Sequence, residues 1–202
     1  MPEPAPIPRL TALLAAAALL CLGAACSRDD SSGQAPVPRP KAYARAYDYG
    51  HSYRALDSLP LHIEANAAAT VRRPRPGAVD IVYPRYNATI HLSLVTLPAD
   101  DPEAISRARH SRLERAALNL GATRASDSQH TNPAGFSVIT LRALSAIPTP
   151  LQLIADDGRR HLLSATAFVG FTPSPSATDS LAPLIDALQG DMRHLADKLT
   201  AQ

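Results

Sequence analysis

Apolar and polar residues alternate in the central part of this chain, which is the pattern of strands that bury one face. In the stretch 89–95 the side chains of Ile90, Leu92 and Leu94 share one face, leaving His91 and Ser93 on the other. Similar stretches, dense in β-branched and aromatic residues, lie at 61–64, 79–83, 136–141, 150–155 and 161–171. The pattern therefore predicts a set of short strands.

Two turn signals join neighbouring strands of this set. Residues 84–87 (Pro-Arg-Tyr-Asn) lie between two of the stretches and are residue types that favour turns. Asp156, Asp157 and Gly158 lie between the last two stretches, and Asp-Gly is a strong hairpin signal. We therefore interpret the two carboxylates as turn residues in preference to a catalytic pair.

Two stretches have the three-and-four spacing of an amphipathic helix. The first follows acidic residues and Pro102, which suit a helix start, and ends at Gly121. Its expected apolar stripe is Ile105, Ala108, Leu113, Ala116, Ala117 and Leu120, and its expected solvent side carries Arg107, Arg109, Arg112 and Arg115. The second begins at an N-cap of Asp179 or Ser180. Its stripe is Leu181, Leu184, Ile185, Leu188, Met192, Leu195 and Leu199.

The order of these elements indicates the fold class. Strands, a helix, further strands and a final helix are typical of an α+β fold in which helices pack on a sheet. We predict an antiparallel sheet of about five to seven strands with two packed helices. The expected domain is single and spans 43–200.

The N-terminal residues predict export and lipid attachment. Residues 10–22 are almost entirely Leu and Ala, which suits the apolar region of a signal peptide and is too short to span a bilayer. Small residues then lead into Cys26, a pattern that resembles the cleavage and acylation site of bacterial lipoproteins. We expect a signal peptide at 1–25, lipidation of Cys26 and a polar, proline-rich tether at 26–42. The alternative is an ordinary secretory peptide without an acylated cysteine.

Composition and charge argue against a nucleic-acid partner. The formal net charge is +2 and only 19% of the residues are charged, so no strongly basic surface is expected. The densest basic group, Arg72 to Arg75, is interrupted by Pro74 and lacks aromatic neighbours, and we interpret it as a solvated loop.

Several segments together resemble the GldD-type gliding-motility lipoproteins. Residues 38–45 (Pro-Arg-Pro-Lys-Ala-Tyr-Ala-Arg) are similar to the start of the mature proteins, and 83–93 resembles the family's central strand pair. The segments 148–153, 161–165, 179–183 and 191–195 follow in the family's order, so that the resemblance covers about 36–199. The element order is also similar to the PsbP/Mog1-like sandwich.

The resemblance implies a role in the cell envelope of Bacteroidota. It implies a non-catalytic lipoprotein, palmitoylated and held at the outer membrane facing the periplasm. There the protein would support the assembly of gliding and type IX secretion components, which would be its partners. An alternative is a lipid-anchored binding module for peptidoglycan or another envelope polymer, with the group at 72–75 as its contact.

The candidate partner-binding residues lie on the tether and on the central strand pair. The tether is extended and carries charges and aromatic anchors, so it loses little entropy on docking. The alternative is that its end packs as an edge strand at 43–47. The candidates are Pro38, Arg39, Pro40, Lys41, Tyr43, Arg45, Tyr83, Tyr86 and His91.

No pattern in the sequence predicts catalysis. Among the seven histidines no pair is separated by four residues or fewer, so no helix or strand presents two metal ligands together. His91 and His161 would converge only if their strands were neighbours, and we favour structural roles for both. Nucleophile, phosphate-loop and metal motifs are absent. We expect no enzyme activity, cofactor, metal or small-molecule substrate.

Overall fold

The structure is a computed structural model that describes residues 50, 52–56, 59–101, 103–121, 124–144, 147–170 and 177–202. The chain forms two compact units, Met1–Lys41 and Ala42–Gln202, and all of these residues belong to the second. The predicted signal peptide, Cys26, the whole tether and the strand at 43–47 lie outside the described residues.

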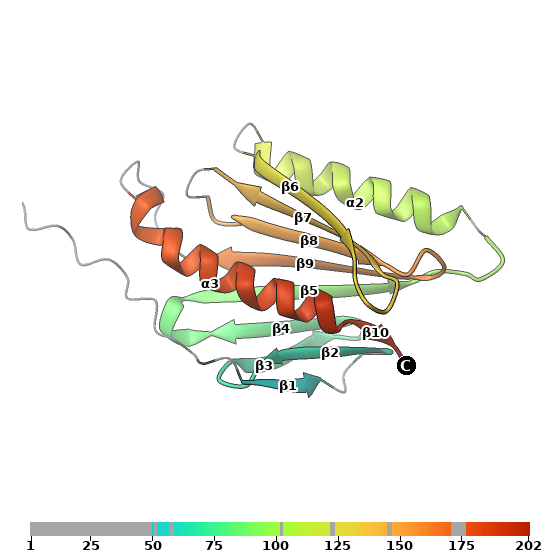
Figure 1. Cartoon of the computed structure of the whole chain (residues 1–202), viewed down its shortest axis with the longest axis horizontal. Coiled ribbons are helices and arrows are strands. Elements are labelled where there is room, and N and C mark those ends of the chain that lie inside the picture. Colours follow the sequence, from blue (N-terminus) through green and yellow to red (C-terminus); the bar gives the residue numbers. More distant parts are fainter. Residues whose placement is uncertain are drawn as a thin grey trace, which may run out of the picture. The chain divides into compact units, whose positions relative to one another are not determined.

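A seven-stranded antiparallel sheet organises the second unit (Figure 1). Its spatial order is β3, β4, β5, β9, β8, β7, β6, with β3 and β6 at the edges. The strands are β3 (Thr70–Arg75), β4 (Ala78–Tyr83), β5 (Ala88–Thr96), β6 (Arg124–Thr131), β7 (Ser137–Ala143), β8 (Leu151–Asp156) and β9 (His161–Val169). A short 3-10 helix, η1 (Pro84–Tyr86), joins β4 to β5.

A helix packs on each face of this sheet. On one face, α3 (Ala177–Lys198) lies beside a second sheet of β1 (Tyr53–Leu56), β2 (Leu61–Asn66) and β10 (Thr200–Ala201). On the other face, α2 (Ala104–Leu120) packs mainly on β7, β8 and β9. Alternating side chains of one strand therefore enter two cores: Leu163 joins the α3 core and Leu162 joins the α2 core.

The predicted fold class is confirmed: the fold is α+β, with two helices and antiparallel sheets. The strands expected in the central and C-terminal parts are present, and the Asp-Gly turn joins β8 to β9 as an antiparallel hairpin. Gly121 ends α2, as expected, and its N–H donates to the carbonyl of Ala117. At the start of α2, Asp101 accepts a hydrogen bond from the N–H of Glu103.

Three details of the prediction were wrong. Residues 70–75 form the edge strand β3, with a register shift between Arg72 and Arg75 in its pairing with β4. An edge strand tolerates Pro74 because one side of it needs no N–H donors. Helix α3 begins at Ala177, a good helix former, ahead of the expected N-cap. Arg109 and Arg112 are half-buried and do not lie on a fully solvated helix face.

Strand β6 was not predicted at all. Its sequence, Arg-Ala-Ser-Asp-Ser-Gln-His-Thr, has almost no apolar residues. A strand at the edge of the sheet, as β6 is, can form without a run of apolar side chains. None of the helices in the described residues is long and apolar enough to cross a membrane.

Candidate functional site

A polar groove of about 530 Å³ lies between α2 and the strands at the β3 side of the sheet. We call it the α2 groove. Three arginines line it, Arg75 from β3 and Arg112 and Arg115 from α2. The polar residues of its floor are Asp80, His91, Ser93, Ser164 and Thr166. Side chains from four strands and a helix thus meet at one surface.

Strand register explains why the floor of the groove is polar. Asp80 of β4 is paired with His91 of β5, and His91 is paired with Thr166 of β9. Paired residues of an antiparallel ladder point to the same side of the sheet. Ser93 of β5 and Ser164 of β9 form the same kind of pair, two residues further along β5 than His91. The alternation that buries Ile90 and Leu92 on the α3 face therefore aligns polar side chains on the α2 face.

The α2 groove has an excess of positive charge. Of the described residues that line it, only Asp80 is acidic, and that carboxylate lies 2.8 Å from Nδ1 of His91. No ion pair joins Arg75, Arg112 or Arg115 to a carboxylate in the described part of the chain. Burial, together with the nearby charges of Arg115 and Arg75, lowers the pKa of the Arg112 guanidinium. The three cations are thus close enough to repel one another.

The groove continues beneath α2 towards a buried amide. This extension, of about 60 Å³, shares Arg112, Arg115, Ser164 and Thr166 with the α2 groove and also contacts Gln152 of β8. Gln152 is only 5% exposed, and its Nε2 has no hydrogen-bond partner among the described residues. An unpaired buried donor is uncommon and destabilising unless something else accepts from it.

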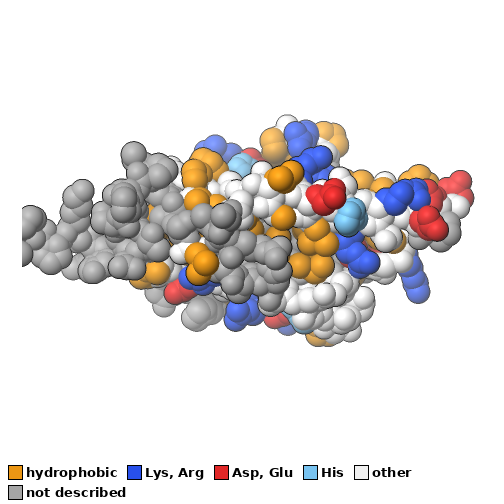
Figure 2. Space-filling model, turned by 90° about the horizontal axis from the view of Figure 1, so that it is seen from above, with side chains coloured by type: hydrophobic (Ala, Val, Ile, Leu, Met, Phe, Trp, Pro, Cys, Tyr) orange, Lys and Arg blue, Asp and Glu red, His pale blue; other side chains and the backbone are white. Residues whose placement is uncertain are grey.

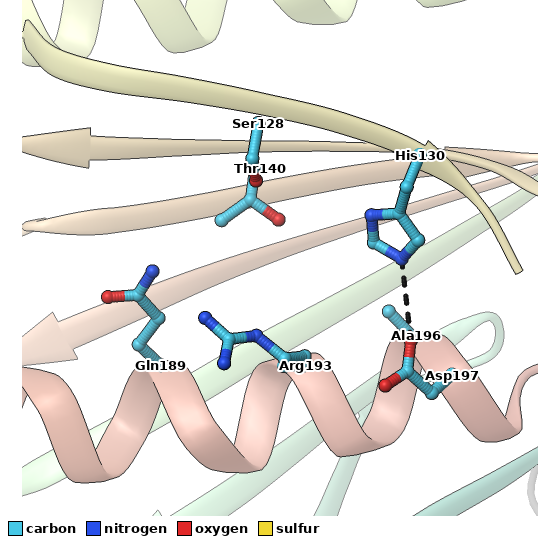
Figure 3. Close-up of a pocket in the computed structure, with 7 residues that line it drawn as sticks. All are labelled: Ser128, His130, Thr140, Gln189, Arg193, Ala196 and Asp197. Carbon is cyan, nitrogen blue, oxygen red and sulfur yellow. Dashed lines mark ion pairs between the residues drawn. The ribbon is translucent and has the colours of Figure 1, made fainter.

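A second groove, of about 330 Å³, lies between α3 and the strands β6 and β7 (Figure 3). Gln189 and Arg193 extend from α3 towards the strands, which contribute Ser128, His130 and Thr140 (Figure 3). One ion pair lies in this α3 groove and another lies beside it, while Arg193 has no ion pair among the described residues. His130 lies 3.4 Å from Asp197, and Arg142 lies 2.7 Å from Asp186.

A hydrogen-bond network joins α3 to the smaller sheet and to β4. The carboxylate of Asp191 accepts from the phenols of Tyr53 and Tyr83, at 3.0 and 2.7 Å. Next to it, His194 stacks on the Tyr53 ring and lies 2.8 Å from Glu64 of β2. The hydrogen bond with His194 is the largest cause of a lowered Glu64 pKa. This network connects α3 to β1, β2 and β4.

Every histidine of the described residues lies within ion-pair distance of a carboxylate. The pairs are His62 with Glu64, His91 with Asp80, His110 with Glu114, His130 with Asp197, His161 with Asp157 and His194 with Glu64. Within the described ranges no three His, Cys, Asp or Glu side chains are grouped as metal ligands. His91 and His161 do not converge, although β5 and β9 are neighbours: His91 pairs with Thr166 and His161 with Thr96.

The predicted partner-binding residues of the central strand pair differ in their exposure to solvent. Tyr83 and Tyr86 belong to the α3 core, with 1% and 9% of their surface exposed, so their rings are not available to a partner. His91 is exposed and lies in the α2 groove. The remaining candidates, on the tether, lie outside the described residues. Gln152 was missed, because an isolated Gln in an apolar strand gives no sequence signal.

Charged side chains are dispersed on the face of the molecule seen from above (Figure 2). In the view from above, Lys and Arg side chains occupy several separate places with acidic and apolar side chains between them (Figure 2).

Together, these features define a two-helix α+β sandwich with polar grooves beside both helices. Residues 33–200 match the family described as Gliding motility lipoprotein GldD, and the chain belongs to this family. The resemblance found in the sequence is thereby confirmed. The family identifies the chain as a lipid-anchored envelope protein with a role connected to gliding.

Comparison with solved structures found a similar chain in the Ran-binding protein Mog1p of Saccharomyces cerevisiae. The two are 10% identical, and the similarity covers 75% of this chain and 96% of Mog1p with a TM-score of 0.48. No curated protein sequence matched the chain.

Proposed function

We propose that this protein is a non-catalytic accessory factor for gliding motility and type IX protein secretion, anchored by Cys26 to the outer membrane and facing the periplasm. The match over residues 33–200 carries the proposal, because it includes part of the tether together with the whole described domain. The partners would be other envelope proteins of the gliding and secretion machinery. The tether residues and the exposed His91 are the proposed contacts.

The side-chain chemistry of the described residues supports a binding role. Their histidines are engaged by carboxylates, and Asp156 and Asp157 accept hydrogen bonds within the β8–β9 turn. A general acid or base needs a titratable group that is free to reach a substrate. The two carboxylates that the sequence offered as a possible catalytic pair are thus engaged in holding the turn.

Secretion of cargo in a deletion strain tests this proposal. Deletion should stop both gliding and cargo release, and the intact gene should restore them. A Cys26→Ala copy should fail because it lacks the lipid anchor, whereas Cys21→Ala, a matched change within the signal peptide, should restore both. Normal secretion in the deletion strain would contradict the accessory role.

One observation favours a second candidate function, binding of an envelope polymer such as peptidoglycan. In the segment at 72–75, which was the predicted polymer contact, Arg75 lines the α2 groove together with Arg112 and Arg115. An Arg75→Glu variant should then lose binding to isolated peptidoglycan and keep its association with partner proteins. Arg160→Glu reverses a charge in the exposed β8–β9 turn and is the matched control. Equal binding by both variants would exclude this candidate.

A further inference from the structure

The α2 groove gathers more cationic hydrogen-bond donors than acceptors: its Asp80 carboxylate is paired with His91, and its Ser164 hydroxyl donates to the Ser93 carbonyl at 3.3 Å. Arg75, Arg112 and Arg115 supply guanidinium N–H groups from two sides, and none of them is paired with a carboxylate in the described residues. The hydroxyls of Ser93, Ser164 and Thr166 line the floor. Three cations at one groove repel one another at a cost, which water lowers more for the exposed Arg75 and Arg115 than for the half-buried Arg112. An anionic ligand would remove that cost.

Gln152 gives a second and independent indication of a ligand. Its side chain is almost fully buried and its Nε2 has no partner among the described residues, and Gln152 lines the same extension as Arg112 and Arg115. A hydrophobic residue would fill this position in β8 without leaving a donor unpaired. The amide is therefore better explained as a donor to a bound group than as part of the core.

The directions and charge of these donors distinguish between anions. Donors come from the strands below, from α2 at one side and from β3 at the other. A phosphate monoester presents oxygens in three directions and carries a charge of about −1.5 to −2 near neutral pH. A carboxylate presents two oxygens in one plane and carries a single charge. A tetrahedral dianion therefore matches three guanidiniums and a floor of hydroxyls better than a carboxylate does.

The α3 groove provides a contrast within the same molecule. His130 is paired there with Asp197 and the neighbouring Arg142 with Asp186, so that Arg193 alone among the cations lining it has no ion pair within the described residues. In the described part of the chain, it is the α2 groove that combines unpaired arginines with a buried unpaired donor.

We propose that the α2 groove is a binding site for a phosphate monoester, held by Arg75, Arg112 and Arg115, with Gln152 as a buried donor. The inference is drawn from the geometry of the groove and does not rest on the gliding role, although the groove also holds His91 and Arg75, the proposed partner and polymer contacts. The phosphate could be carried by a soluble compound or by a lipid headgroup, because both present the same terminal oxygens to the arginines.

Calorimetric titration of the full-length protein in detergent with inorganic phosphate tests the proposal. Phosphate should bind and raise the melting temperature, while chloride at the same ionic strength should not. Loss of one arginine contact, in Arg112→Gln or Arg115→Gln, should weaken phosphate binding by about ten- to a hundredfold. Arg160→Gln removes an exposed arginine outside the groove and should bind as the wild type does.

Variants of Gln152 separate ligand binding from folding. Gln152→Leu keeps a similar volume and removes the unpaired amide, so it should weaken phosphate binding without lowering the melting temperature. Gln152→Glu places a carboxylate beside Arg112 and Arg115. This variant should melt at a higher temperature than the wild type and no longer respond to phosphate.

Three outcomes would overturn the proposal. They are the absence of phosphate binding by the wild type, wild-type affinity in the double variant Arg112→Gln/Arg115→Gln, and equal binding of acetate or isolated peptidoglycan, which would identify a carboxylate site. The source of the phosphate follows from a further comparison. Equal affinity for glycerol 3-phosphate and short-chain phosphatidic acid supports a soluble ligand, and tighter binding of the lipid supports a headgroup.

Discussion

The phenol of Tyr83 donates a 2.7 Å hydrogen bond to the carboxylate of Asp191, which lies 108 positions later in the chain. Tyr83 ends β4 and is only 1% exposed, whereas Asp191 belongs to α3. Hydrogen bonds to a charged acceptor are stronger than neutral ones, and a partly buried site strengthens them further. This bond therefore helps to fix the position of α3 on the sheet.

Removing the Tyr83 hydroxyl should destabilise the domain. Tyr83→Phe keeps the ring in the core and should lower the free energy of unfolding by about 1.5–3 kcal/mol, the usual range for a hydrogen bond to a charged group. Tyr53→Phe removes the other phenol from the same carboxylate, but Tyr53 is half-buried, so its loss should be smaller. Urea denaturation of both variants measures the difference, and an equal loss in the two would contradict this ranking.

Alkaline titration should detect the same network. Burial raises the pKa of the Tyr53 phenol from 10.0 to about 12, with further contributions from the charge of Asp191 and the hydrogen bond to it. A raised pKa means that the native state favours the neutral phenol. Its contribution to stability is complete below pH 10 and is lost as the pH rises towards 12. Ultraviolet absorbance of the phenolate should show Tyr53 ionising at lower pH in Asp191→Asn than in the wild type.

Asn132 should be among the least replaceable polar residues. Its Nδ2 donates to the carbonyls of Ala196 and Leu199, both at 2.8 Å, at the end of α3. Its Oδ1 accepts from the N–H groups of Ala134 and Phe136 in the β6–β7 turn. Since Asn132 is 4% exposed, Asn132→Ala leaves several buried groups unpaired, and we expect a loss of about 2–4 kcal/mol.

Thermal unfolding would measure that loss, and Asn132→Asp provides the control. The carboxylate has a similar shape and keeps an acceptor for the turn, but it cannot donate to the two helix carbonyls. A stability close to that of the wild type in either variant would show that the turn and α3 hold together without this side chain.

The Asp157 carboxylate should make the β8–β9 turn sensitive to acid. Burial alone would raise its pKa, but hydrogen bonds from the N–H groups of His161, Arg159 and Arg160 and from the His161 ring outweigh burial and lower the pKa below 3.8. A lowered pKa stabilises the native state above the unfolded pKa, and this contribution disappears as the pH falls through the native pKa.

Asp157→Asn should therefore be less stable than the wild type near neutral pH, by about 1–3 kcal/mol. The difference should shrink in acid once the wild-type carboxyl is protonated. Urea midpoints at a series of pH values measure this, with Asp100→Asn as a control at an acidic residue outside the turn. A difference that is constant with pH would exclude the ionised carboxylate as its cause.

Gly170 should resist substitution for steric reasons. A Cβ at this position would lie 2.4 Å from Nδ2 of Asn87, which itself donates to the Gly170 carbonyl at 2.7 Å. Gly170→Ala should therefore disrupt the join between η1 and the end of β9 and lower the melting temperature. Gly190→Ala is the matched control, because a Cβ there meets nothing within 4 Å and alanine favours the helix. A higher melting temperature is expected for that variant.

The parts of the fold that were predicted correctly are those whose side chains alternate or repeat clearly. Ile90 and Leu92 mark β5, and the leucines of α3 mark its buried stripe, because burial on one face imposes these periods. Strands β3 and β6 escaped prediction because edge strands need little apolar surface, and Pro74 obscured β3 further.

The α2 groove could not be predicted, because its residues meet only through tertiary structure. Arg75, Arg112 and Gln152 come from an edge strand, a helix and an inner strand that are far apart in the sequence. Tyr83 was predicted to contact a partner and is buried instead. Its aromatic side chain at the end of a strand resembles a surface anchor, and only the position of Asp191 on α3 reveals that it points inward.

The edge strand β3 also bears on how copies of this protein meet. A free strand edge is a template on which another chain can add a strand. Here the edge carries exposed Arg72, Arg73 and Arg75, which repel a second copy of themselves, and Pro74, which offers no N–H. An acylated protein is confined to two dimensions at high local density, where collisions between copies are frequent. We therefore expect this arginine-rich segment to disfavour strand pairing between the β3 edges of neighbouring copies.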